Sequence, residues 1–474
     1  MTLESRSPRH AASLHLAIGA RREIDAVTML TVYLVLLLAI PSGVTITALG
    51  TLGRPSLIWG LVLVVWWAVA RLQTDADGVP GISQPVRFAF AAFVVVALLS
   101  FAAAMLRGQP DDQLSPAVTA LIRLLSWAGV FLVAVDGIRT MSELSAMVRR
   151  IGIGAGLLAA LGLLQVVTGQ ALVGFFGSVP GLSLAGGLGE RAGVIRSSGT
   201  AIHPLEYATA LNAALPLVIA VAVSLGFRRN PSSRDLWWWL PVGLISVSSL
   251  VAVSRSAIIG FVVAVISMLP AVPRRYLPAT LGVGTIVAFA VFAASPGLLS
   301  TTIGLFTGIG DDPSTQSRTR GVELVPGFMS HSPLIGTGYG IFLPRYYIFD
   351  NQWVLLAVEL GTLGILAFAG LFVAGIWSAR RARFSADPGI RLLGHALAAA
   401  MFNVAVLFLF FDGLSFPIAG GMLFLLLGLC ASIRAVAAGD GPGMPESAGT
   451  RPIPDRRDGR APSEDFDRIG PPTP

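Results

Sequence analysis

The chain has 474 residues, of which 54% are hydrophobic and 12% are charged, and its formal net charge is +7. Soluble globular domains carry about 25% charged residues, so this composition excludes an ordinary soluble domain. The basic side chains are all arginine and are spread along an apolar chain, which favours membrane topology over nucleic-acid binding as their explanation. Cys430 is the sole cysteine, so neither an intrachain disulfide nor a cysteine metal site can form.

Apolar stretches of membrane-spanning length recur along the chain. They predict an all-α polytopic membrane protein of about twelve transmembrane helices, with one long extracytoplasmic loop between spans nine and ten. The predicted spans are 26–41, 56–70, 88–106, 117–136, 150–168, 204–226, 236–253, 255–272, 277–295, 351–379, 392–411 and 414–433.

The spans divide the chain into three parts. Residues 1–25 form a short segment before the membrane, 26–433 form the transmembrane domain, and 434–474 form a tail whose Pro, Gly and mixed charge predict disorder. Most arginines fall in alternate connections, which the positive-inside rule assigns to the cytoplasm together with both termini. The connections 169–203 and 296–350 are then extracytoplasmic.

Arginines on the outer side run against the insertion bias and call for a further reason. Most of them lie in three outer segments, two of which also hold histidines and acids. The residues are Arg191, Arg196 and His203 before the sixth span, Arg255 in the turn between spans seven and eight, and Arg318, Arg320, His331, Arg345 and Asp350 in the long loop.

Guanidinium groups hold phosphate oxygens in a bidentate manner, so converging arginines suit a pyrophosphate headgroup at the outer leaflet. Two simpler explanations remain open: the arginines extend to lipid phosphates, or they pair with acids such as Glu190, Asp311 and Asp312. Arg123, within the fourth span, either faces a polar cavity or extends to the interface from the helix end.

The order of four motifs, within roughly 190–370, resembles the O-antigen ligase and polymerase superfamily of membrane glycosyltransferases. RSSGTAIHPLEYA, which has Leu205 where Asn is common, resembles the family's entry to a helix, and VSRSAIIG resembles its Ser-Arg turn. Arg318 precedes SPLIGTGYGIF as an arginine precedes the family's Pro-Leu-Leu-Gly-x-Gly motif. DNQWVLLAVELGTLG resembles the family's His-Asn-x-x-Leu and Glu-x-Gly segment, with Asn351, Glu359 and Gly361 in register.

The resemblance implies an enzyme in the cytoplasmic membrane of a bacterium, with its active site facing outside and no cofactor or metal. Its partners would be a polyprenyl-pyrophosphate-linked oligosaccharide donor, a glycan acceptor and membrane lipids, with a flippase and a chain-length regulator beside it. Arg196, Arg255 and Arg318, with Arg191 and Arg320, would hold the pyrophosphate.

Asp350 stands where many members, particularly ligases, carry the histidine that is thought to activate the acceptor hydroxyl. This departure favours a polymerase of oligosaccharide repeats over a ligase that moves a finished glycan. Asp350 could act as the base, and it could equally be the N-cap of the following helix. His203 and His331 are alternative bases. The remaining class is a transporter or flippase. Transporters built from two repeated halves should show paired polar features in each half, whereas this chain has one long outer loop, late in the sequence.

Overall fold

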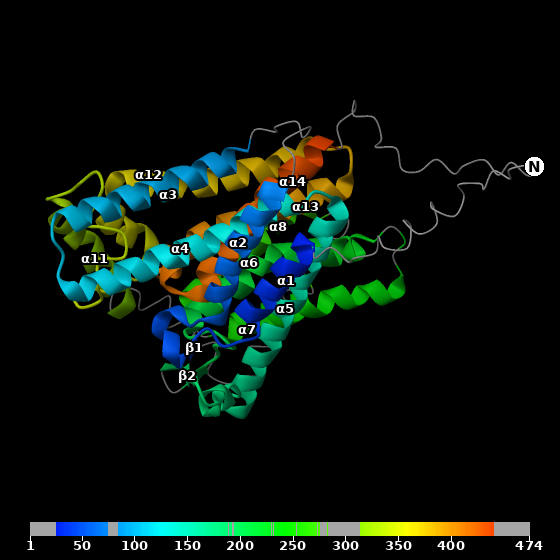
Figure 1. Cartoon of the computed structure of the whole chain (residues 1–474). Coiled ribbons are helices and arrows are strands. Elements are labelled where there is room, and N and C mark those ends of the chain that lie inside the picture. Colours follow the sequence, from blue (N-terminus) through cyan, green and yellow to red (C-terminus); the bar gives the residue numbers. More distant parts are fainter. Residues whose placement is uncertain are drawn as a thin grey trace, which may run out of the picture.

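The computed structural model describes residues 25–73, 84–187, 189–191, 194–228, 230, 232–252, 254–272, 274, 282 and 313–439. This part of the chain is a bundle of helices (Figure 1). The helices are α1 (Ala26–Leu38), α2 (Pro55–Gln73), α3 (Pro85–Leu106), α4 (Asp111–Gly137), α5 (Met141–Thr168), α6 (Pro204–Val223), α7 (Trp239–Val251), α8 (Arg255–Met268), α11 (Pro313–Met329), α12 (Gln352–Arg380), α13 (Pro388–Leu407) and α14 (Pro417–Gly439).

Short elements lie in the connections. Strand β1 (Val44–Ile46) pairs antiparallel with β2 (Leu182–Leu184), and β3 (Gly189–Arg191) pairs antiparallel with β4 (Val194–Arg196). The all-α prediction therefore missed two small sheets in the region of the 169–203 connection. The 3-10 helices are η2 (Thr47–Leu52), η3 (Gly174–Ser178), η4 (Leu225–Phe227), η5 (Ser233–Trp238), η6 (Leu269–Ala271), η8 (Arg381–Phe384) and η9 (Gly413–Ser415).

Eight helices of the described ranges are long and apolar enough to cross a membrane, namely α2 to α6 and α12 to α14. Helices α1, α7 and α8 lie at predicted spans but have 13, 13 and 14 residues, fewer than the about 20 that a straight crossing needs. The predicted span 277–295 falls almost wholly outside the described residues, as do 296–312 of the long loop and most of both tails. The number of spans, twelve, stays a prediction.

Local sequence sets several helix starts. Thr140 and Glu143 form a capping box at α5, and the Asp387 side chain accepts the N–H groups of Gly389 and Ile390 at α13. His203 caps α6, with Pro204 in the first turn. Such contacts satisfy amide groups that a helix start leaves without partners inside the helix.

Helix α14 lies at the centre of the bundle and is buried along most of its length. Its glycines allow close approach to α4: a Cβ on Gly428 would lie 2.5 Å from the Cβ of Ala134. Small residues at such crossings are typical of helix packing in membranes. Helices α2 and α3 instead present large apolar side chains outward, with Val65 63% and Phe88 73% exposed, as expected of helices that face lipid.

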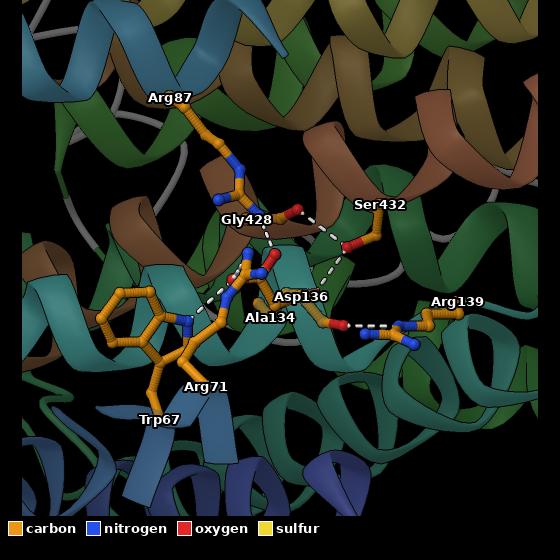
Figure 2. A network of polar contacts seen from close by, with 8 residues as sticks. All are labelled: Trp67, Arg71, Arg87, Ala134, Asp136, Arg139, Gly428 and Ser432. Atoms are coloured by element: carbon orange, nitrogen blue, oxygen red, sulfur yellow. Dashed lines mark hydrogen bonds and ion pairs between the residues drawn. The ribbon is translucent and has the colours of Figure 1, made fainter. Parts of the chain in front are cut away.

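Asp136, near the C-terminal end of α4, joins three helices at one end of the bundle (Figure 2). Its carboxylate accepts hydrogen bonds from Trp67 Nε1 (2.7 Å) and Arg71 Nη2 (2.9 Å) of α2, and it pairs with Arg87 of α3. A carboxylate at a helix C-terminus is disfavoured by the helix dipole, and these donors compensate for it. These contacts therefore hold α2, α3 and α4 together at this end of the bundle, which the positive-inside rule assigns to the cytoplasm.

The opposite end, called the site end, holds the connections that the sequence assigns to the outside. There α2, α4, α6, α8, α12 and α14 begin, and α11 lies beside the ends of α3, α4 and α12 (Figure 1). Glu206 in the first turn of α6 joins several of these segments. Its carboxylate accepts the Ser42 hydroxyl (2.8 Å) and the backbone N–H groups of Ile202 (3.0 Å) and Ile418 (2.7 Å).

Candidate functional site

Helix α11 comes from the predicted long loop and packs against the residues that precede α12. The Tyr347 hydroxyl donates to the carbonyl oxygen of Ser317 at 2.5 Å, and a Cβ on Gly321 would lie 3.2 Å from the Phe349 ring. The predicted irregular loop therefore contains a helix that covers residues 347–349.

Arg318 of α11 connects two segments at the site end. Its Nε donates to the backbone carbonyl of Asp350 (3.2 Å), and its Nη2 donates to the carbonyl of Phe410 (2.9 Å), just after α13. Its guanidinium also lies over the Phe410 ring, 5.8 Å from the centroid. The structure thus brings together Arg318 and Asp350, the two residues that the sequence proposes as catalytic.

Asp350 is half-buried, and burial raises the pKa of its carboxyl although the Arg318 charge opposes that shift. The N-cap of α12 is not Asp350 but Asn351, whose side-chain oxygen accepts the N–H groups of Trp353 (3.0 Å) and Val354 (3.3 Å). The capping explanation for Asp350 is wrong, because the Asn351 side chain already supplies the acceptor that the helix start needs.

Helix α12 is broken at Gly361, where φ is 67° and ψ is −162°. Residues 332–342 run beside the break and take over the hydrogen bonds that the helix loses there. Thr337 N donates to the carbonyl of Val358 (2.9 Å), and Thr362 N donates to the carbonyl of Pro333 (2.9 Å). Irregular backbone at membrane depth needs such protein partners, so the SPLIGTGYGIF motif and the break form one unit.

This glycine-rich segment holds the Glu359 side chain. The backbone N–H groups of Gly340 and Phe342 donate to the Glu359 carboxylate. Gly336, with φ of 70°, lies so close that an added Cβ would be 2.3 Å from the Glu359 carbonyl carbon. The motif's glycines therefore have a physical reason: the backbone must turn through left-handed conformations around a buried acid.

Beside Glu359 lies a cavity of about 290 Å³ between α4, the glycine-rich segment, the start of α12 and the turn after α13. Its polar lining includes Arg123, Tyr339, Gln352, Glu359 and Asp412. Arg123 thus faces this cavity, and its Nη1 donates to the Leu414 carbonyl (3.0 Å). Asp350 lies outside this lining.

Asp412 was missed by the sequence analysis, although it is an acid in the short turn between the last two apolar spans, within FFDGLSF. Burial raises the pKa of its carboxyl to about 6, and the charge of Asp350 adds to that rise. A hydrogen bond with Ser415 and the Arg123 charge act in the opposite direction. Arg318, Asp350, Asp412 and Arg123 therefore form a continuous set of interacting charges.

The other two arginine segments also lie at the site end. His203 Nδ1 accepts the N–H of Leu205 (3.2 Å), and burial, together with the Arg196 charge, lowers the pKa of the imidazole. Arg255 is the first residue of α8, where Ala257 packs against Ala208 of α6. The His203 ring is 5.8 Å from Phe416, in the turn that also carries Phe410.

The remaining predicted site residues have other surroundings. Arg345 is exposed, pairs with Asp112 of α4 and donates to the Tyr346 hydroxyl (2.9 Å). His331 is exposed, with Nδ1 3.0 Å from the Ser330 hydroxyl, and Arg320 is exposed on α11. Arg191 belongs to β3, and its side chain is outside the described part. Among the described residues, no three His, Cys, Asp or Glu side chains are placed to hold a metal ion.

Residues 240–369 match the family model described as O-antigen ligase. The match includes Arg255, Arg318, the glycine-rich segment and the break in α12, whereas Arg123, Arg196 and Asp412 lie outside it. No curated protein matches the chain. The match and the apolar helices together indicate an integral membrane protein that resembles membrane glycosyltransferases. Residues 240–369 therefore match an O-antigen ligase domain, which supports the resemblance of the chain to the O-antigen ligase and polymerase superfamily.

Proposed function

We propose that the protein joins polyprenyl-pyrophosphate-linked oligosaccharide repeats into a cell-envelope glycan or exopolysaccharide on the outer side of the cytoplasmic membrane. The family match supports a lipid-linked glycan donor and an acceptor. The observation that carries the proposal is the position of Arg318 inside the matched domain. Its guanidinium bonds the Asp350 and Phe410 carbonyls, and Phe349 and Asp412, which are close to them in sequence, line the cavity beside Glu359.

In this proposal, arginines stabilise the leaving pyrophosphate. The negative charge on the pyrophosphate grows as its bond to the anomeric carbon breaks, and fixed guanidinium groups lower the energy of that state. Arg318 is the central group, and Arg196 and Arg255 approach from their own segments at the site end. This electrostatic role needs no metal, and metal independence is part of the proposal.

The acceptor hydroxyl attacks the anomeric carbon and gives its proton to a carboxylate. Asp350 is the base proposed from sequence, and its raised pKa suits it better than an unperturbed Asp, because a base works best near the operating pH. A covalent glycosyl intermediate would need a nucleophile on the chain, and we propose direct displacement with inversion instead.

The main alternative is a ligase that transfers a finished glycan to an acceptor. The matched family model, described as O-antigen ligase, favours it, whereas the departure at Asp350 favours the polymerase. A flippase that delivers the donor and a chain-length regulator belong to the polymerase proposal.

The test is reconstitution of the purified protein into liposomes with lipid-linked oligosaccharide extracted from the host membrane. A ladder of lengthening glycans on a gel supports a polymerase. A single glycan product on an added acceptor fraction supports a ligase instead. Movement of the donor across the bilayer without a new glycosidic bond would replace the enzyme by a transporter.

A further inference from the structure

The cavity beside Glu359, called the Glu359 cavity, differs from the arginine segments in its chemistry. Its lining combines two acids, an amide and aromatic rings with one arginine, Arg123. Hydroxyl-rich ligands need donors and acceptors of this mixed kind, whereas a pyrophosphate needs concentrated positive charge. The volume of about 290 Å³ is near the lower end of the roughly 300–1,000 Å³ of small-molecule pockets. It therefore suits a sugar unit rather than a long chain.

Two of the charged groups in the lining are already held by the protein. Glu359 receives the backbone N–H groups of Gly340 and Phe342, and Arg123 Nη1 binds the Leu414 carbonyl. Arg123 Nε, however, is buried and has no hydrogen-bond partner among the described residues. A buried donor without a partner costs about 1–3 kcal/mol, so a ligand hydroxyl that satisfied it would bind more tightly.

Asp412 connects the Glu359 cavity with the arginine side of the site. Asp412 lines the cavity, and its carboxylate interacts electrostatically with Asp350. The backbone carbonyl of Asp350 in turn accepts a hydrogen bond from Arg318. A hydroxyl group in the cavity next to Asp412 would therefore lie toward the place where Arg318 holds the leaving group. Asp350, in contrast, does not line the cavity.

We propose that the Glu359 cavity binds the acceptor sugar and that Asp412, rather than Asp350, is the catalytic base. This inference rests on the proposed function. The acceptor hydroxyl oxygen forms the new bond to the anomeric carbon of the donor. The bond from that carbon to the pyrophosphate oxygen breaks, and its electron pair leaves with the lipid pyrophosphate. The hydroxyl proton passes to the Asp412 carboxylate, which later releases it to water.

The first test replaces the base with its amide. Proteoliposomes carrying Asp412→Asn receive lipid-linked oligosaccharide from the host membrane, and glycan transfer is measured on a gel. Loss of general-base catalysis predicts a fall of roughly 10²–10⁴-fold. Binding of polyprenyl pyrophosphate, measured by tryptophan fluorescence, stays within about threefold of the unmodified protein, because the arginine side is intact. The matched control is Asp111→Asn, at an exposed acid in the first turn of α4.

A second variant tests the cavity without touching an ionisable group. Leu355 lines the Glu359 cavity, and Leu366 of the same helix is 68% exposed. Leu355→Trp fills the space, and we expect transfer to fall at least about tenfold, since even small misplacement of a reactant can cost about 10²-fold. Leu366→Trp keeps full activity and controls for the added ring.

The outcomes are distinguishable. Transfer by Asp412→Asn within about threefold of the unmodified protein overturns the inference, as does a greater loss in Asp350→Asn than in Asp412→Asn. Full activity of the Leu355→Trp variant would contradict an acceptor site in this cavity, even if Asp412→Asn fails to fold. Absence of transfer in the unmodified protein, with polyprenyl pyrophosphate still bound, contradicts the proposed function itself and the inference with it.

Discussion

The Nε of Arg318 lies 3.2 Å from the backbone carbonyl oxygen of Asp350. A residue of α11 is thus fixed to the segment that leads into α12, and its second hydrogen bond fixes it to the turn after α13. Arginine suits this position because its planar group can bond backbone carbonyls and still present a permanent charge to a phosphate.

Arg318→Ala should weaken binding of polyprenyl pyrophosphate. Hydrogen bonds to charged groups contribute about 1.5–3 kcal/mol, so we expect roughly 10–150-fold weaker binding in a fluorescence titration. Arg383→Ala removes an equal charge from an exposed residue of η8, at the other end of the bundle, and should bind normally. Equal weakening in both variants would mean that net charge, and not the position of Arg318, governs binding.

Gly336→Ala should destabilise the glycine-rich segment. The added Cβ would lie 2.3 Å from the Glu359 carbonyl carbon, and the residue would keep a φ of 70°. Overpacking alone costs about 1–3 kcal/mol, so the melting temperature in detergent should fall clearly. Gly327→Ala, in α11, has open space at the new Cβ and serves as the control. An unchanged melting temperature for Gly336→Ala would contradict the packing described at the break in α12.

Asn351→Ala should lower thermal stability, because it removes the acceptor for the Trp353 and Val354 amides. Loss of such an N-cap costs about 1 kcal/mol. Asp350→Asn leaves this cap in place and should melt close to the unmodified protein. A lower melting temperature for Asp350→Asn than for Asn351→Ala would instead identify Asp350 as the cap.

The transfer rate should fall in acid if Asp412 is the base. A base must be deprotonated, and burial together with the Asp350 charge places the pKa of Asp412 at about 6. The rate should therefore be constant above that pH and decline tenfold per pH unit well below it. Arg123, Glu359 and Ser415 also face Asp412 and set the exact midpoint.

The Asp350→Asn variant is a second test of whether Asp412 is the titrating base. It removes a negative charge that raises the pKa of Asp412, so the acid limb should move to lower pH. A pH profile without an acid limb between pH 5 and 7, or a limb that Asp350→Asn moves upward, would exclude Asp412 as the titrating base.

Much of the architecture could be predicted from hydrophobic length alone. The helices from α2 to α6 and from α12 to α14 lie at predicted spans, because a long apolar run has few other stable environments. The two small sheets could not be predicted, since their strands have only three residues each, and β1 pairs with β2 across a long sequence separation. Helix α11 was missed because its sequence is too polar to resemble a span.

The candidate site was predicted in part. The motif order singled out both Arg318 and Asp350, although their contact is seen only in the structure, and Arg123 was identified as costly to keep in lipid. Asp412 was not found, because a single acid in a two-residue turn looks like a solvated residue until the fold buries it. Likewise, the backbone N–H donors around Glu359 and the cap at Asn351 depend on backbone geometry that spacing does not encode.

The most direct test of the central claim is glycan transfer in proteoliposomes that contain host lipid-linked oligosaccharide, with the unmodified protein, Arg318→Ala and Arg383→Ala compared at equal folded amounts. We predict a ladder of lengthening glycans with the unmodified protein and Arg383→Ala, and its loss with Arg318→Ala. An unchanged ladder with Arg318→Ala would contradict the role of this site in glycan transfer.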